Sequence, residues 1–249
     1  MTSRGQRSGR ALADLAVVAG LALLLALLLA VLQTACSPVR SLESEPLPPA
    51  TSAGAVVRTL LDDVRRVARR PDLPGYDRSC SPGDGCVFGT DWSDATEAPL
   101  SRNGCDTRND VLGATLVDVE FSERSNGCDV VAGLLVDPYT GDTLDYATDG
   151  SQIHIDHLFP LAAAWDLGAA SWSAAERATF ANDPDLELLA VSGTANLSKG
   201  DSTPADWLPP DADFHCSYVR AYLEVALAYD LAITDADRAA MERVLVQGC

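Results

Sequence analysis

Basic residues are scarce in this chain. Of its 249 residues, 18 are Lys or Arg and 36 are Asp or Glu, which gives a net charge of −18 at pH 7. This balance argues against a protein that adheres broadly to nucleic acid through charge alone. Lysine is the scarcest cation, because Lys199 is the single lysine and every other residue in the basic count is an arginine.

The sequence also lacks any Cys-x-x-Cys pair, the spacing that is typical of zinc sites, so a structural zinc ion is disfavoured. Seven cysteines are nevertheless present, and one of them, Cys36, follows an apolar N-terminal run. The other six predict disulfides formed in an oxidising compartment. Pairing neighbours along the chain, with other connectivities left open, predicts three bridges: Cys80–Cys86, Cys105–Cys128 and Cys216–Cys249.

The first 36 residues have the features of an export signal. Three arginines come first, and an uncharged run then extends over residues 15–32. Ala35 is a small residue just before Cys36, which favours a lipoprotein signal with Cys36 as the lipidated residue. A plain signal peptide or an uncleaved signal anchor remains an alternative, because Gln33 stands three residues before Cys36, where a lipoprotein signal usually has Leu. The apolar run is long for a signal peptide and barely long enough to span a bilayer.

Residues 37–53 are rich in Pro, Ser and Glu and are predicted to be a flexible tether. Residues 54–249 are enough for one extracytoplasmic domain with a sizeable core, which we expect to be monomeric and either secreted or held at the membrane by the N-terminal segment.

The spacing of apolar residues predicts an α+β domain with an N-terminal helix, a small antiparallel sheet and a C-terminal helical hairpin. Ser173 and Glu176 form a capping-box signal. Helices are predicted over residues 54–70, 107–116, 162–167, 173–181, 216–231 and 234–246, and a helical turn from 193 or 194 carries Asn196 and Lys199. Strands are predicted over residues 117–121, 130–136, 143–146, 152–158 and 187–191.

The stretch from His154 to Lys199 gathers side chains suited to phosphodiester hydrolysis. This reaction needs a base that activates water, a cation near the developing negative charge and a group that holds the phosphate. His157 is the candidate base, because imidazole titrates near neutral pH. Asp156 and Asn196 are candidate metal ligands, because carboxylate and amide oxygens favour Mg²⁺ or Mn²⁺. Lys199 is expected to contact the scissile phosphate as a point charge.

The spacing of these residues sets a condition on the geometry. Asn196 and Lys199 are three residues apart, so they share one helix face. Asp156 and His157 are successive residues of a strand, and in a flat strand they point to opposite faces. A common site therefore requires the ladder to end or to bulge at this pair.

Several segments resemble the HNH, or His-Me finger, endonucleases, and more closely the secreted GmrSD-like HNH family with its HxxP motif. The motif is His157-Leu-Phe-Pro160 in this chain. The likeness extends over most of residues 75–220, in the segments GCDTRNDVL (104–112), NGCDVVAG (126–133), DPYTG (137–141), IDHLFPLAAAWDLGA (155–169), FANDP (180–184) and ANLSKGD to PADWLPP (195–210).

The resemblance implies a ββα-metal core at residues 152–210 and an endonuclease that cleaves DNA with little sequence specificity. It also implies a divalent metal, which we expect to be Mg²⁺, with Mn²⁺, Zn²⁺ or Ni²⁺ as alternatives. Glu187 stands where the family tends to have an Asn that orients the catalytic histidine, so Glu187 is the candidate for that role. Arg108 either pairs with Asp106 or Asp110 or makes a second phosphate contact.

Two other functions are consistent with the sequence. The strong negative charge and the presence of Glu187 favour a lipid-anchored binding module that keeps the scaffold and has lost turnover. The same acidic surface suits a hydrolase of some other phosphodiester whose substrate is small or carries little charge.

Overall fold

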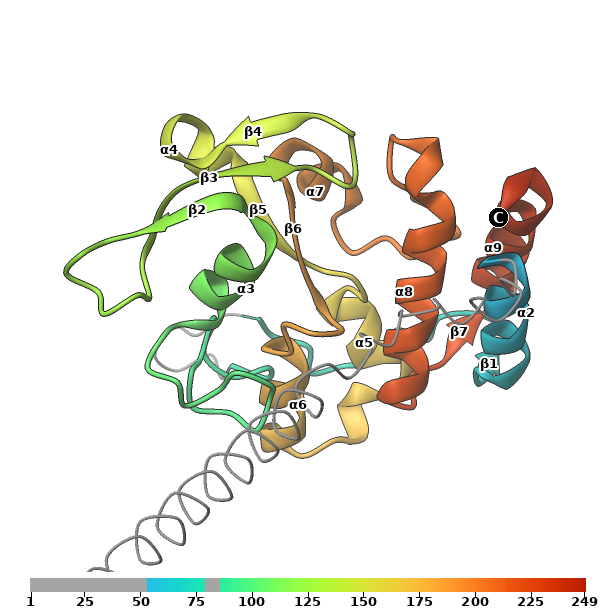
Figure 1. The fold of residues 1–249 in the computed structure, drawn as a ribbon. Helices are drawn as coiled ribbons and strands as arrows, with labels where there is room; N and C mark the ends of the chain where they lie inside the picture. Colours follow the sequence, from blue (N-terminus) through green and yellow to red (C-terminus); the bar gives the residue numbers. More distant parts are fainter. Residues whose placement is uncertain (1–52, 79–85) are drawn as a thin grey trace, which may run out of the picture. The chain divides into compact units, whose positions relative to one another are not determined.

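The order of helices and strands confirms the α+β class (Figure 1). The computed structural model describes residues 53–78 and 86–249. Its helices are α2 Ala53–Asp63, α3 Thr107–Thr115, α4 Tyr146–Asp149, α5 Leu161–Leu167, α6 Ala174–Ala181, α7 Gly193–Lys199, α8 His215–Ala228 and α9 Asp235–Gly248. Its strands are β1 Arg66–Val67, β2 Val117–Phe121, β3 Val130–Val136, β4 Thr143–Asp145, β5 Ile153–His157, β6 Leu188–Ser192 and β7 Ile233–Thr234.

Some predictions fall on parts of the chain that the structure does not describe. The export signal at residues 1–36, nearly all of the tether at 37–53, and Cys80 lie outside the described residues. Within the described residues, none of the helices is both long enough and apolar enough to cross a membrane.

Helix α2 is shorter than its apolar spacing predicts. It ends at Asp63 instead of continuing to Arg70, and the chain then forms the short strand β1. β1 pairs in parallel with β7, and the Ile233 amide donates to the Arg65 carbonyl oxygen at 2.9 Å. The Arg65 guanidinium also donates to the Asp230 carbonyl oxygen at 2.8 Å. These long-range contacts override a local helix pattern that extends over residues 54–70.

Helices α3 and α6 begin directly after capping residues. The side chain of Asp106 accepts a hydrogen bond from the Asn109 amide at the start of α3. Ser173 and Glu176 form the predicted capping box of α6. Each cap satisfies backbone amides that the first turn of a helix leaves without partners. Local sequence therefore marks the starts of these two helices.

The strands β2, β3 and β4 form an antiparallel sheet in that order. The turn between β3 and β4 is the DPYTG segment, in which the Asp137 carboxylate accepts from the Tyr139 amide at 3.1 Å and from the Thr140 hydroxyl at 2.6 Å. Gly141 has a φ of 77°, a conformation that favours glycine. This turn directs the Tyr139 side chain into the interior, where it is fully buried.

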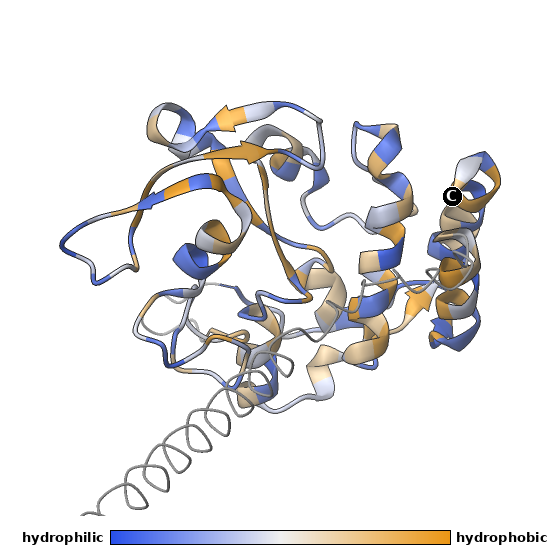
Figure 2. Cartoon of the chain, in the orientation of Figure 1, coloured by the Kyte–Doolittle hydropathy of each residue, from blue (hydrophilic) through white to orange (hydrophobic). Residues whose placement is uncertain are grey.

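The strands β5 and β6 form a separate antiparallel ladder that lies between two apolar clusters. Strand alternation places the side chains of Ile153 and Ile155 on one face, where they pack with α3 and β3 in the smaller cluster. The larger cluster joins α2, α5, α6, α8 and α9. Figure 2 shows that β3 and β6 are largely hydrophobic, whereas the connection between β2 and β3 is hydrophilic. Helix α7 follows β6 directly and packs against both strands of the ladder.

Two of the three predicted disulfides are confirmed. Cys105 is bonded to Cys128, which ties the start of α3 to the start of β3. Cys216 is bonded to Cys249, which ties α8 to the C-terminal residue. Cys86 is disulfide-bonded as well, and its predicted partner Cys80 lies outside the described residues.

Candidate functional site

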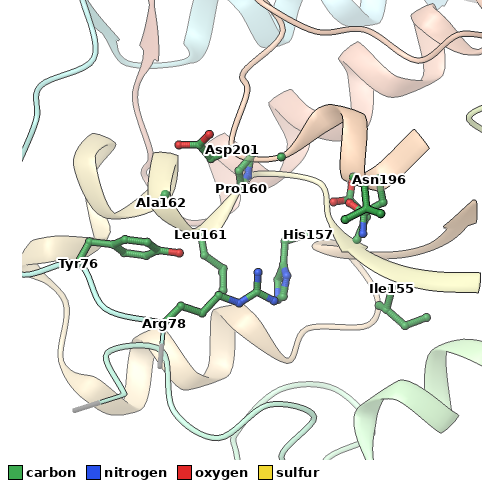
Figure 3. Close-up of a pocket in the computed structure, with 12 residues that line it drawn as sticks. Tyr76, Arg78, Ile155, His157, Pro160, Leu161, Ala162, Asn196 and Asp201 are labelled. Atoms are coloured by element: carbon green, nitrogen blue, oxygen red, sulfur yellow. The ribbon is translucent and has the colours of Figure 1, made fainter. Parts of the chain in front are cut away.

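A cavity of about 300 Å³ lies beside the end of β5 and the start of α5 (Figure 3). Asp156 and His157 line it from β5, and Asn196 lines it from α7. Tyr76 and Arg78 line it from the segment that follows β1. Three of the residues that the sequence assigns to one site thus border one cavity.

The Asp-His pair meets the condition that the sequence sets. The β5–β6 register is regular up to its last pair, His157 with Leu188, so the strand ends at the histidine and does not bulge. Successive side chains point to opposite faces of the ladder. Because the ladder stops there, both Asp156 and His157 still border the cavity.

The imidazole of His157 is held by a backbone carbonyl and an indole ring. Its Nε2 lies 3.0 Å from the carbonyl oxygen of Ala181, at the last residue of α6. A carbonyl oxygen can only accept, so Nε2 carries the proton and Nδ1 has a free lone pair. The Trp92 ring stacks on the imidazole, with ring centroids 6.0 Å apart and an interplanar angle of 12°. The histidine is therefore fixed as the tautomer that can accept a proton at Nδ1.

The FANDP segment explains why a carbonyl group points at His157. Asn182 ends α6, and its side-chain oxygen accepts from the Ser93 amide at 2.8 Å, which fixes the loop that carries Trp92. Asp183 accepts from the amides of Asp185 and Leu186 with its side chain, and from the Tyr229 hydroxyl at 2.5 Å. A helix C-terminus leaves carbonyl groups without intrahelical partners, and Ala181 supplies one of them to His157.

Burial lowers the pKa of His157 to about 3, and the positive charges of Arg78 and Lys199 act in the same direction. The hydrogen bond to Ala181 acts in the opposite direction. The imidazole is therefore neutral at pH 7, which is the state that a general base requires. A bound phosphate brings negative charge, and negative charge near an imidazole raises its pKa.

Asp156 belongs to a buried cluster of charged and polar groups. The Lys199 ammonium lies 2.9 Å from Oδ1 and 2.7 Å from Oδ2 of the carboxylate. The Tyr139 hydroxyl donates to Oδ2 at 2.5 Å. Burial, followed by the charge of Asp156, raises the pKa of Tyr139 well above its usual value, so this phenol stays protonated and remains a donor. The carboxylate is thus held in place from two sides.

The structure places Lys199 away from the expected phosphate contact. Its ammonium also donates to the carbonyl oxygen of His157 at 2.6 Å, so each of its three hydrogens has an acceptor. The residue is 1% exposed and does not line the cavity. An ammonium in this position balances the charge of Asp156 and connects the end of β5 to α7.

The donors at the cavity fit a hard divalent cation in part. Oδ1 of Asp156 accepts one hydrogen bond and Oδ2 accepts two, so Oδ1 keeps a lone pair. Asn196 is partly exposed and adds an amide oxygen from α7. Among residues 53–78 and 86–249, no group of three or more His, Cys, Asp and Glu side chains is arranged to hold a metal. Two protein oxygens with water in the remaining positions match the way proteins bind Mg²⁺.

Glu187, the expected orienting partner of His157, contacts another group. Its Oε2 accepts from the Phe159 amide at 3.2 Å, and its Oε1 is buried without a hydrogen bond among the described residues. The histidine takes its orientation from Ala181 and Trp92 instead. Glu187 therefore supports the backbone just after the Asp-His pair.

Replacing Glu187 with glutamine is expected to stabilise the protein increasingly as the pH rises. Burial raises the pKa of Glu187 well above its usual value, although the Phe159 amide and Lys199 oppose the shift. The folded state therefore binds this proton more tightly than the unfolded state. Its contribution to stability is complete below the unfolded pKa and is lost as the pH rises toward the folded pKa, by up to about 1.4 kcal/mol per pH unit. Glutamine keeps an acceptor for Phe159 and does not titrate.

Urea unfolding of both proteins from about pH 5 to about pH 8 checks this expectation. The difference in unfolding free energy between the variant and the wild type should grow with pH. A difference that is the same at every pH would show that the carboxyl is not held neutral in the folded protein.

Arg108 does not border the cavity. Its guanidinium donates to the carbonyl oxygen of Ile153, at the first residue of β5, at 3.0 Å. Neither expected arrangement, an ion pair with Asp106 or Asp110 or a position at the cavity, is found for the described residues. The arginine instead connects α3 to the strand that ends in the Asp-His pair.

Four groups at the site carry no functional assignment from the sequence. Tyr139 and Ala181 lie inside the DPYTG and FANDP segments, which resemble the family without indicating a role. Trp92 and Arg78 lie in an irregular part of the chain that has no periodic pattern. A search for aromatic and cationic residues in the segments that precede α3 could have proposed these last two, but not their contacts.

Comparison with known proteins shows the family to which the chain belongs. The family model described as GmrSD restriction endonucleases, C-terminal domain, matches residues 106–244. A relative from Arthroderma benhamiae, described as an uncharacterized secreted protein, is 33% identical over 203 residues, which cover 80% of this chain and 88% of the relative. No solved structure matches the chain. The matched region contains the β5–β6 ladder, α7 and the Asp-His pair, and the chain therefore belongs to the nuclease family of GmrSD restriction endonuclease C-terminal domains.

Proposed function

We propose that this protein is an exported endonuclease of the HNH type that hydrolyses phosphodiester bonds in DNA with a divalent metal ion and little sequence specificity. The observation that carries the proposal is the state of His157 at the cavity. Its Nε2 is hydrogen-bonded to the Ala181 carbonyl oxygen, which leaves Nδ1 as the proton acceptor of a histidine that lines the same cavity as Asp156 and Asn196. A fixed neutral base next to hard oxygen donors suits activation of a water molecule for attack on phosphorus.

The roles of the individual residues follow from their contacts. His157 accepts the proton of the attacking water at Nδ1 while Ala181 and Trp92 hold the ring. Asp156 and Asn196 are the residues that would hold the metal, which we expect to be Mg²⁺. When bound, such an ion stabilises the negative charge that develops on the phosphate and leaving oxygens. Lys199 positions Asp156 and balances its charge within the interior.

A bound metal ion would offset, at the cavity, the repulsion between this acidic protein and DNA. With a charge of −18, the protein repels DNA at long range, and broad electrostatic adhesion contributes little to binding. A cation at Asp156 adds local positive charge where a phosphate must bind. We therefore expect weak, ion-dependent association with DNA and cleavage that depends strongly on the divalent ion.

Export is supported by covalent chemistry and by the relative. The bridges Cys105–Cys128 and Cys216–Cys249 are typical of proteins that fold in oxidising compartments. The relative from Arthroderma benhamiae is described as secreted. We propose that this chain acts outside the cytoplasm, either free or anchored through residues 1–36, as a monomer.

The test of this function is a cleavage assay on the disulfide-bonded protein with a panel of divalent ions. Plasmid DNA should be nicked and then degraded with Mg²⁺ or Mn²⁺, and EDTA should abolish the reaction because it removes the divalent ion that stabilises the charge on the leaving oxygen. Hydrolysis of a bis-aryl phosphate ester without DNA cleavage would assign the enzyme to another phosphodiester. If neither DNA, RNA nor the ester is cleaved with any ion, the chain is a binding module and the proposed activity is wrong.

A further inference from the structure

The cavity needs a cation that can reach a phosphate, and Lys199 is not that cation. Its ammonium is buried and its three hydrogens have acceptors in the protein. Among the described residues that line the cavity, Arg78 is the one that carries a positive charge. Its side chain is exposed, and no ion pair with another described residue holds it. The guanidinium is thus available to an incoming anion.

Arg78 also lies close to the candidate base, His157. Figure 3 shows its guanidinium directed toward the His157 imidazole across the cavity. A phosphate placed between the guanidinium and the Asp156–Asn196 oxygens would lie next to Nδ1 of His157.

The segment that carries Arg78 is fixed on α5. The Asp166 carboxylate accepts from the Leu73 amide at 3.0 Å and from Nε of Arg70 at 2.7 Å. The rings of Tyr76 and Trp165 pack with their centroids 6.4 Å apart. The carbonyl oxygen of Asp77 accepts a hydrogen bond from the Val87 amide at 3.1 Å. α5 begins directly after the HxxP motif. The same short helix therefore sets the distance between Arg78 and the Asp-His pair.

We propose that Arg78 binds the phosphate that is cleaved in this cavity and is the substrate-binding cation of the enzyme. This inference rests on the proposed function. A guanidinium presents parallel N–H donors that match two phosphate oxygens, so it binds phosphate with a defined orientation as well as with charge. Arg78 lies outside residues 106–244, the region that the family model matches. The segment before the family domain thus completes the active site.

Two substitutions and one matched control test this role in the disulfide-bonded chain. Arg78→Ala should lower kcat/KM for DNA cleavage by about 10-fold to 100-fold, the scale of one charge-assisted contact to a reacting phosphate. Arg78→Lys should retain part of the activity, because it keeps the charge and loses the paired donors. Arg124→Ala removes the same charge from an exposed arginine in the β2–β3 connection that does not line the cavity, and it should stay close to wild type.

Binding of a short DNA duplex in Ca²⁺, followed by fluorescence anisotropy, separates this inference from the proposed function. Arg78→Ala should weaken binding by about 10-fold relative to Arg124→Ala. If the wild type cleaves DNA and the two alanine variants have equal rates and equal affinities, Arg78 makes no phosphate contact while the nuclease function stands. If the wild type cleaves nothing, the function fails, and the affinities alone decide whether Arg78 binds phosphate. Equal affinities in that case would overturn the inference too.

Discussion

Replacing Lys199 with methionine is expected to lower the unfolding free energy by about 3–5 kcal/mol, the cost of leaving a buried charge without its partner. Methionine fills similar space but removes the ammonium that contacts both oxygens of Asp156 and the His157 carbonyl. The side chains of Lys199 and Asp156 are 0% and 5% exposed, so water cannot replace the lost contacts. Denaturant unfolding of the two proteins measures the loss.

The double variant Lys199→Met with Asp156→Asn is the matched control. It removes both charges together, and replacing a buried ion pair as a unit is far less costly than breaking it. We expect the double variant to be more stable than Lys199→Met alone. If the two have equal stability, the ammonium does not compensate the Asp156 charge, and the cluster of Lys199, Asp156 and Tyr139 is not held together as the contacts indicate.

Replacing His157 with alanine is expected to reduce the rate of DNA cleavage by about 10²–10⁴-fold, the usual contribution of a positioned general base. The variant loses Nδ1, the lone pair that the Ala181 hydrogen bond keeps free. Affinity for DNA should change little, because the imidazole is neutral. The variant also keeps Arg78 and the Asp156 and Asn196 oxygens that we expect to bind the metal ion. The measurement is the initial rate of plasmid nicking at saturating Mg²⁺, with DNA affinity measured separately.

His157→Gln is the control that separates loss of the proton acceptor from loss of the hydrogen bond to Ala181. Glutamine can still donate to the Ala181 carbonyl, but it cannot accept a proton at neutral pH. It should therefore be as inactive as alanine while folding like the wild type. If His157→Gln keeps wild-type cleavage, the histidine is a structural residue and another group must activate the water.

Local sequence determined the parts of the fold that depend on neighbouring residues. The capping residues Asp106 and Ser173 mark helix starts, and the alternation of β3 and β5 marks strands, because each is a short-range interaction. Helix α2 shows where prediction from local sequence fails. Its apolar spacing extends to Arg70, but the helix ends at Asp63 because the chain then pairs as β1 with β7. That pairing joins residues far apart in sequence, which local spacing does not reveal.

The candidate site shows the same limit. The pattern of residue types identified Asp156, His157 and Asn196, which border one cavity. It could not identify the Ala181 contact, because a backbone carbonyl leaves no mark on residue type. The interior position of Lys199 depends on how α7 packs against β5, which spacing within a helix does not specify. Glu187 was assigned by analogy to an orienting role, and its contact with Phe159 follows from the path of the chain after β5.

A crystal structure of the His157→Ala variant with a short DNA duplex and Mn²⁺ tests the proposed mechanism most directly, because this variant should bind DNA without cutting it. The mechanism predicts Mn²⁺ bound by the Asp156 carboxylate and the Asn196 side-chain oxygen, with a DNA phosphate between the ion and the space left by the imidazole. Anomalous scattering identifies the ion without ambiguity. A DNA phosphate and an ion bound outside this cavity, or an ion with no contact to Asp156, would contradict it.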